Sequence, residues 1–284
     1  CVWLGTRSEG LFRFTPSILQ SIMPEYTGKP LNLYSLHEGG DGAMYFASYG
    51  LGAGVWRAGR ISAPPPPLLS KAFALCVEQL RDGRVLAGTF HGGLWLVRDG
   101  DMQPFATDHL GRLDDVWLIH EDRQGALWIG TQQGLWRAKD GAWTRYGPDD
   151  GLGSAWVRTC VERANGELWF GTQGGGVAIW RGGRFEKLGE KEGLAAPSVR
   201  GLFEDDRGVV WIATEGQGIA RVALPEGRPL REARVKHVRA RDGLYADVVH
   251  TLLADDAGGL WGSTNHGLFR VARASLDAFA EGKS

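Results

Sequence analysis

The chain has 284 residues, a formal net charge of −1 and 43 glycines. Acidic and basic residues are interspersed along it, which gives no electrostatic surface for DNA or RNA, so we expect no nucleic-acid partner. No apolar run approaches the roughly 18 residues that a membrane-spanning helix requires. The glycines recur at regular turn positions, and apart from 274–280 no stretch keeps a helical period. The composition therefore favours an all-β chain.

Three cysteines, Cys1, Cys76 and Cys160, make an odd number. Cys76 and Cys160 fall on predicted inner strands, where a free thiol usually behaves as a small apolar side chain. Cys1 raises a lipoprotein interpretation, but it runs directly into a predicted core strand and no signal peptide precedes it. No His/Cys cluster has the spacing of metal ligands. We therefore expect no disulfide framework, no metal and no cofactor.

A short motif repeats through the whole chain. It begins at residues 2–6 as Val-Trp-Leu-Gly-Thr, and a Gly-Leu pair follows at 10–11. The last residue of each copy falls at Thr6, Ser48, Thr89, Thr131, Thr172, Thr214 and Thr264, so successive copies are 42, 41, 42, 41, 42 and 50 residues apart. A fixed period of about 42 residues indicates a repeat architecture.

One period shows the pattern of a strand repeat. Val157–Glu162 is a β-rich run, and Ala164–Gly166 is a hairpin turn because Asn-Gly supplies the positive φ angles that primed turns require. Three further strands follow at Glu167–Thr172, Val177–Trp180 and Arg184–Leu188. Four short antiparallel strands, which we name A to D from inside to outside, make one propeller blade. Seven copies predict an all-β, seven-bladed β-propeller of four-stranded antiparallel blades.

We expect residues 1–284 to form a single propeller whose first and last blades are incomplete. The first copy starts at its B strand, and no fourth strand is evident after the last one. Because propellers usually leave no exposed edges, the sequence favours a segment of a longer chain. Blade 2 carries a glycine-rich excursion at 49–54, prolines at 64–67 form an extended link, and blade 6 holds eight surplus residues around 225–234.

The motifs together resemble a known repeat. An Asp-x-x-Gly hairpin turn (Asp122–Gly125) precedes Leu-Trp-Ile-Gly-Thr at 127–131, then Gly-Leu-x-Arg (Gly134–Arg137), and the outer strand ends in Asp-Gly-Leu (Asp150–Leu152). This pattern resembles the two-component regulator propeller repeat over nearly all of 1–273, more weakly in blades 2 and 3. The resemblance implies a bacterial periplasmic or extracytoplasmic sensor, commonly for polysaccharide fragments. It also implies an output signalling module on the same polypeptide, and association through the full-length receptor.

The repeated tryptophans are interpreted as architecture. They occupy one equivalent position in the B strand, and burial of such a ring between blades contributes on the order of 2–3 kcal/mol. The five residues are Trp3, Trp128, Trp169, Trp211 and Trp261. Trp56, Trp95 and Trp136 share a second equivalent position on strand C, and the same interpretation applies. A functional site is therefore sought where the repeats differ.

The repeats differ on strand A, at the residue after a constant valine: this position holds Trp117, Arg158, Arg200 and His250, and blade 3 has Leu75. If strand A begins at one face, the D–A and B–C loops share that face. The B–C loops add Arg7, Tyr49, His91, Gln132, Gln133, Gln173, Glu215, Gln217, Asn265 and His266. Loops on a rigid scaffold commonly carry binding residues.

These residue types suit a carbohydrate or small anionic ligand. Amides donate and accept hydrogen bonds, arginine grips carboxylates, and rings stack on C–H faces. Arg158 and Arg200 interrupt an otherwise apolar strand, so each needs an acidic partner such as Glu215 or a wet channel mouth. The predicted ligand-binding set is Trp117, Trp156, Arg158, Arg200, His250, Gln132, Gln173, Glu215, Asn265 and His266.

Two alternatives stay open. In polysaccharide or streptogramin lyases with a propeller fold, His and Tyr abstract and return a proton, and Tyr49, His91, His250 and His266 could serve in that way. A protein-interaction propeller without a small ligand is the other. No paired carboxylates or nucleophile motif stands out, so we expect a binding domain with no catalytic residues.

Overall fold

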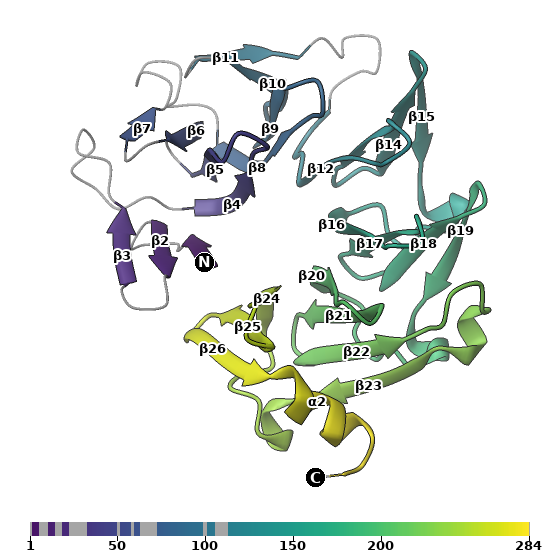
Figure 1. Ribbon diagram of the computed structural model, residues 1–284. Coiled ribbons are helices and arrows are strands. Elements are labelled where there is room, and N and C mark those ends of the chain that lie inside the picture. Colours follow the sequence, from purple (N-terminus) through teal and green to yellow (C-terminus); the bar gives the residue numbers. More distant parts are fainter. Residues whose placement is uncertain are drawn as a thin grey trace. The chain divides into compact units, whose positions relative to one another are not determined.

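The computed structural model describes residues 2–5, 11–14, 19–22, 33–49, 52–57, 60–62, 73–98, 101–105 and 113–283. They form short antiparallel strands and one C-terminal helix (Figure 1). The chain divides into two compact units: unit 1 comprises 1–132 and 136–144, and unit 2 comprises 133–135 and 145–284. We describe each unit by itself.

Unit 1 contains a three-stranded sheet followed by sheets of four strands. The three-stranded sheet is β1 (Val2–Gly5), β2 (Leu11–Phe14) and β3 (Leu19–Ile22). The second sheet comprises β4 (Leu33–Glu38), β5 (Met44–Ser48), β6 (Gly52–Arg57) and β7 (Arg60–Ser62). The third sheet comprises β8 (Phe73–Gln79), β9 (Val85–Phe90), β10 (Gly93–Arg98) and β11 (Asp101–Pro104). The division between the units falls within the sheet β12 (Leu118–Glu121), β13 (Leu127–Gly130), β14 (Leu135–Lys139), β15 (Ala142–Tyr146).

Unit 2 contains three further sheets and the helix. Two have four strands: β16 (Val157–Glu162), β17 (Leu168–Thr172), β18 (Val177–Arg181), β19 (Arg184–Leu188), and β20 (Val199–Glu204), β21 (Val209–Thr214), β22 (Ile219–Ala223), β23 (Arg234–Val238). The last has three strands, β24 (Val249–Ala254), β25 (Gly259–Thr264) and β26 (Gly267–Ala272). Helix α2 (Arg273–Ala280) follows, which confirms the helical period at 274–280.

The prediction of seven four-stranded blades is wrong. Six sheets begin with an inner strand, namely those opened by β4, β8, β12, β16, β20 and β24, and the structure supports an all-β propeller fold of six small antiparallel blades. The β24 blade has three strands, and the β1–β3 sheet starts directly at the Trp-bearing strand. The sequence count was too high because it counted Trp-bearing B strands, one of which has no inner strand among the described residues.

A turn carboxylate organises the A–B hairpin of several blades. Oδ1 of Asp205 accepts the backbone N–H groups of Arg207 (2.9 Å) and Val209 (3.0 Å), and its Oδ2 accepts the indole N–H of Trp211 at 3.0 Å. The same bond joins Trp128 to Asp122 at 2.7 Å and Trp261 to Asp255 at 2.8 Å. The Asp-x-x-Gly turn therefore satisfies both its own backbone and the polar atom of the tryptophan.

One blade reaches the same result with different residues. Arg163 stands at the position that Asp122, Asp205 and Asp255 occupy in three other turns, and its guanidinium lies 5.2 Å from the ring centroid of Trp169. Oε2 of Glu167 accepts hydrogen bonds from Trp169 Nε1 (3.3 Å) and Arg163 Nη1 (3.2 Å). Arg163 also donates to Glu204 and to the Gly208 carbonyl, in the turn of the next blade. Each of the three guanidinium nitrogens of this buried arginine therefore donates a hydrogen bond, which offsets the cost of burying its charge.

The core lies between neighbouring sheets. Trp169 packs with Ile212 and Val222 of the next sheet, and Trp211 packs with Leu252 and Leu260 of the sheet after it. Trp128, Trp169 and Trp211 are completely buried, so their architectural role is confirmed. The side chain of Trp3 lies outside the described residues, as does Cys1. Cys76 and Cys160 are thiols outside any disulfide, and burial raises the pKa of the Cys76 thiol.

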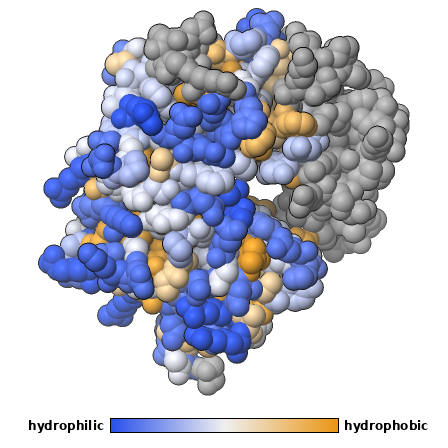
Figure 2. Space-filling model, turned by 180° about the vertical axis from the view of Figure 1, so that it is seen from behind, coloured by the Kyte–Doolittle hydropathy of each residue, from blue (hydrophilic) through white to orange (hydrophobic). Residues whose placement is uncertain are grey.

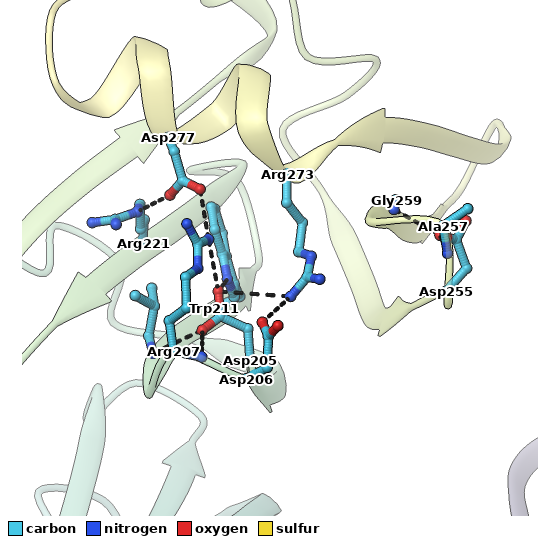
Figure 3. A network of polar contacts seen from close by, with 11 residues as sticks. Asp205, Asp206, Arg207, Trp211, Arg221, Asp255, Ala257, Gly259, Arg273 and Asp277 are labelled. Carbon is cyan, nitrogen blue, oxygen red and sulfur yellow. Dashed lines mark hydrogen bonds and ion pairs between the residues drawn. The ribbon is translucent and has the colours of Figure 1, made fainter.

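Helix α2 is fastened to unit 2 by a shared carboxylate. Asp277 accepts hydrogen bonds from Arg207 (2.6 Å) and Arg221 (2.8 Å), and Arg207 also contacts Asp205 at 3.2 Å (Figure 3). Leu276 lies in the same apolar cluster as Trp211. Among the described residues, no helix combines the length and apolar character that crossing a bilayer would need.

Truncation of the interblade tryptophans is expected to be strongly destabilising. Trp169→Ala and Trp211→Ala should each lower the free energy of unfolding by about 3–5 kcal/mol, because each leaves a cavity between two sheets. Chemical denaturation followed by circular dichroism measures this change. Tyr245→Ala is the control, since that ring is 56% exposed. If the tryptophan variants lost no more stability than the control, these rings would not be the interblade core.

Candidate functional site

The variable position of strand A coincides with a β-bulge. In β16, Val157 pairs with Thr172 and Thr159 pairs with Gly171, so Arg158 is the extra residue. A bulge redirects one side chain without disturbing the rest of the pairing, and bulges are frequent next to binding sites. The equivalent bulge residues in β4, β8, β20 and β24 are Tyr34, Leu75, Arg200 and His250.

Sequence reasoning missed Tyr34. The residue before each bulge lies six positions before the hairpin turn, as Val157 does relative to Arg163. Leu33 bears the same relation to Gly39, which places Tyr34 at the bulge of β4. The spacing carried the signal, but Leu33 stands where the aligned copies have the constant valine.

Four of the predicted site residues form one hydrogen-bonded network in unit 2. Nη1 of Arg158 donates to Oε1 of Gln173 at 3.1 Å. Nε2 of Gln173 is 2.8 Å from Oε2 of Glu215 and 3.0 Å from the hydroxyl of Ser198. Nη2 of Arg200 contacts Oε1 of Glu215 at 2.5 Å. We call these five residues the arginine network.

The local fold explains why these side chains meet. Arg158 and Arg200 are the bulge residues of neighbouring inner strands, β16 and β20, which pack against each other. Gln173 and Glu215 directly follow the B strands β17 and β21. The backbone N–H of Glu215 donates to the Ser198 carbonyl at 3.0 Å. Each B–C loop is thus fixed beside the bulge that it faces.

The electrostatics of the network centre on Glu215. Hydrogen bonds from Gln173 and Arg200 hold the pKa of its carboxyl below the usual range, and the charges of Arg200 and Arg158 add to this, whereas burial opposes it. The Glu215 side chain is 36% exposed and that of Arg200 is 21% exposed. The buried Nε of Arg200 has no acceptor among the described residues. The arginine network therefore holds two cations around one partly exposed anion.

Trp156 lies against this network. The guanidinium of Arg158 is 5.3 Å from the centroid of the Trp156 ring, a cation–π distance. The Trp156 carbonyl accepts the backbone N–H of Gln173 at 2.9 Å, and the hydroxyl of Ser154 donates to the Gln173 carbonyl at 2.6 Å. The loop before β16 and the loop after β17 are therefore joined beneath the two polar side chains.

The next sheet places a second polar pair at the same position. Nε2 of His250 lies 2.7 Å from Oδ1 of Asn265. A Cβ atom built on Gly201 would lie 3.2 Å from the His250 carbonyl, so β20 and β24 run very close together. His266 is exposed, and its carbonyl accepts the Tyr245 hydroxyl at 3.1 Å. Three consecutive inner strands of unit 2 thus each present a polar bulge residue.

The remaining predicted residues do not join this network within one unit. Trp117 and Gln132 belong to unit 1, and Arg7 lies outside the described residues. Of the lyase candidates, Tyr49 and His91 are in unit 1, whereas His250 and His266 are in unit 2. In the described part of the chain, no group of three or more His, Cys, Asp or Glu side chains is placed to hold a metal ion. The face in Figure 2 is largely hydrophilic, with hydrophobic residues in small groups.

Comparison with known families matches residues 111–133 and 193–216 to the family "Two component regulator propeller". The chain carries two-component regulator propeller repeats. The second match, 193–216, ends just after Glu215 and includes Ser198 and Arg200. Part of the arginine network therefore lies within a recognised repeat. No curated protein matched the chain in sequence.

Several solved structures share the fold. The extracellular domain assigned to the hybrid two-component system BT3049 of B. thetaiotaomicron superposes with a TM-score of 0.72 at 24% identity, over 86% of this chain and 33% of that one. PorZ of Porphyromonas gingivalis, a surface component of the type-IX secretion system, gives 0.61 at 12%, over 84% and 38%. Virginiamycin B lyase of Staphylococcus aureus gives 0.62 at 15%, over 84% and 83%.

These likenesses show the propeller fold and do not transfer a ligand or a reaction. The chain spans about a third of the length of the BT3049 and PorZ structures that it matches. Its likeness to the extracellular domain of BT3049 exceeds its likeness to the lyase in both identity and TM-score.

Removal of the Glu215 charge is expected to make the free energy of unfolding less dependent on pH in the acidic range. The folded pKa of Glu215 lies below its ordinary value of 4.5, so its ionisation stabilises the fold above about pH 4.5, and this contribution disappears as the pH falls through the folded pKa. Glu215→Gln should therefore cost up to about 1 kcal/mol at pH 7 and progressively less as the pH falls below 4.5 through the folded pKa. Thermal unfolding between pH 3 and 7 measures this difference.

The matched control is Glu226→Gln, since Glu226 is an exposed carboxylate in the same unit. An equal pH profile for the two variants would contradict the pairing of Glu215 with Arg200.

Proposed function

We propose that this chain is the ligand-binding sensor domain of a bacterial signal-transduction receptor, and that the arginine network receives the carboxylate of an acidic sugar or another small anion. The observation that supports this is the arrangement of two bulge arginines around one partly exposed carboxylate: Arg200 pairs directly with Glu215, and Arg158 is linked to it through the amide of Gln173. The bulge position of β8 holds an apolar residue, Leu75, whereas the equivalent position in β16 and β20 holds an arginine.

Glu215 occupies the place that a ligand carboxylate would take. A guanidinium presents a planar fork of donors that matches a carboxylate with two parallel hydrogen bonds. In the structure, Arg200 contacts Glu215 through Nη2, and its Nε has no acceptor among the described residues. A ligand carboxylate that engaged both nitrogens would displace Glu215 toward solvent. That displacement costs little, because the side chain is already 36% exposed.

The surroundings of the network suit a hydroxylated ligand. Gln173 offers an amide that both donates and accepts, and Ser198 offers a hydroxyl. The Trp156 ring, half-buried beside Arg158, supplies an apolar surface for the C–H face of a sugar. An acidic oligosaccharide would use charge, hydrogen bonds and stacking at one place.

The signalling role rests on the likeness to a sensor domain and on the repeats. We propose that an output signalling module lies on the same polypeptide, that the domain is extracytoplasmic, and that full-length receptors associate. A downstream transmembrane helix followed by a kinase or regulator module in the complete gene would support this proposal. A gene that encodes the propeller alone would contradict it.

The double variant Arg158→Ala with Arg200→Ala is expected to lose affinity for an acidic oligosaccharide by about 100-fold, since each charge-assisted hydrogen bond contributes about 1.5–3 kcal/mol. Isothermal titration calorimetry with trigalacturonic acid measures the affinity, and its methyl ester is the uncharged reference ligand. Glu215→Gln should bind the acid more tightly than wild type, because it removes the internal competitor.

Arg184→Ala is the matched control, since the Arg184 side chain is 79% exposed in the same unit. Equal affinity of the folded double variant and the control would place the site elsewhere. A wild-type protein that did not prefer the acid to its ester would contradict an anionic ligand. Release of shortened or unsaturated sugars would favour the lyase alternative.

A further inference from the structure

Unit 1 carries a row of aromatic side chains that the arginine network does not use. Tyr34 and Tyr49 lie 6.3 Å apart between ring centroids, and Tyr49 stacks on Phe73 at 4.0 Å with an interplanar angle of 10°. Phe73 pairs with Phe90 across β8 and β9, and the Phe90 ring lies 3.9 Å from that of His91. We call these five residues the aromatic row.

The fold of two sheets explains the row. Tyr34 is the bulge residue of β4, and Tyr49 directly follows β5. Phe73 begins β8 and Phe90 ends β9, which brings both to the same end of their sheet. Because β8 packs against β4 and β5, the rings of the two sheets meet. Burial does not explain the two tyrosines, since Tyr34 is 45% exposed and Tyr49 is 48% exposed.

A fixed imidazole lies at one end of the row. The buried Asp115 carboxylate accepts the backbone N–H of His91 at 2.7 Å and lies 2.9 Å from His91 Nδ1. Both residues have positive φ angles, 58° for His91 and 48° for Asp115. Non-glycine residues in this region are strained, and such strain persists where the surroundings fix it. The imidazole is thus held in one orientation although its side chain is 63% exposed.

We infer that the aromatic row is a stacking platform for an uncharged oligosaccharide. Tyr49 stacks on Phe73, which supports its ring on one side while 48% of the residue stays exposed. Exposed rings held rigidly lose little conformational entropy on binding and offer apolar area to the C–H faces of sugar rings. The tyrosine hydroxyls and the imidazole provide hydrogen-bonding groups at the edges of the row.

The geometry and charge of the row disfavour other ligands that stack on aromatic rings. A cage for a quaternary ammonium needs rings that surround the cation, whereas Tyr49 and Phe73 are nearly parallel. A single-stranded nucleic acid needs basic side chains along its backbone, whereas the row contains none and ends at the Asp115 carboxylate. An uncharged ligand with apolar faces and hydroxyl edges matches what is present.

Saturation-transfer difference NMR tests this inference, because it detects magnetisation passing from aromatic protons to the C–H protons of a bound ligand. The probes are cellohexaose, maltohexaose and xylohexaose, with decaproline and an eight-residue oligothymidylate as competing ligand classes. We expect transfer to the C–H protons of at least one hexasaccharide. Tyr49→Ala should weaken its binding by at least about tenfold, as loss of one ring from an aromatic platform does. Tyr49→Phe should keep most of the affinity, because it retains the stacking ring and removes only the edge hydroxyl.

Tyr245→Ala is the matched control, because it removes an exposed tyrosine from unit 2. Circular dichroism and thermal unfolding establish that each variant is folded. The inference is overturned if no hexasaccharide receives transfer, if Tyr49→Ala and Tyr245→Ala weaken binding equally, or if only the peptide or the oligonucleotide binds. The arginine network is tested with a charged ligand and different residues, so failure here leaves that proposal unaffected.

Discussion

The hydrogen bond from a buried indole N–H to the carboxylate of the A–B turn is the interaction on which the blades depend. A tryptophan ring large enough to fill the space between two sheets brings a polar atom with it, and an unpaired buried donor costs about 1–3 kcal/mol. Asp205 supplies the acceptor for Trp211 while it also closes the turn. One residue thereby couples the local conformation of a hairpin to the packing between blades. Where Arg163 replaces the aspartate, Glu167 takes over this role for Trp169.

This arrangement separates architecture from recognition along each repeat. The turn and the tryptophan lie at one end of strand A, and the bulge residue lies five residues earlier, next to the B–C loop. The indole–carboxylate bonds lie away from this position, and the bulge residue differs between blades, as in Leu75, Arg158 and Tyr34. At and beside these bulges, unit 1 places aromatic rings, whereas unit 2 places charged and amide side chains.

Much of the candidate site could be predicted from the sequence. Alignment of the repeats selected Arg158, Arg200, Gln173 and Glu215, because constant spacing from a turn fixes which residues share a register. The number of blades could not be predicted in the same way, since a B-strand motif does not show whether an inner strand precedes it. Tyr34 was overlooked because strand A was aligned on a constant valine, which Leu33 replaces in this blade. The replacement of a turn aspartate by Arg163 and Glu167 involves contacts between blades, which a local motif cannot reveal.

The attachment of helix α2 has a consequence for how unit 2 can open. Asp277 shares Arg207 with Asp205, so the helix and the β20–β21 turn hold the same guanidinium. If the helix separated from the sheet, Arg221 would lose its carboxylate and Leu276 would leave the cluster around Trp211. Fraying at this end therefore loosens the last interblade core instead of remaining local, and amide protons of α2 and β21 should exchange with solvent as one cooperative unit.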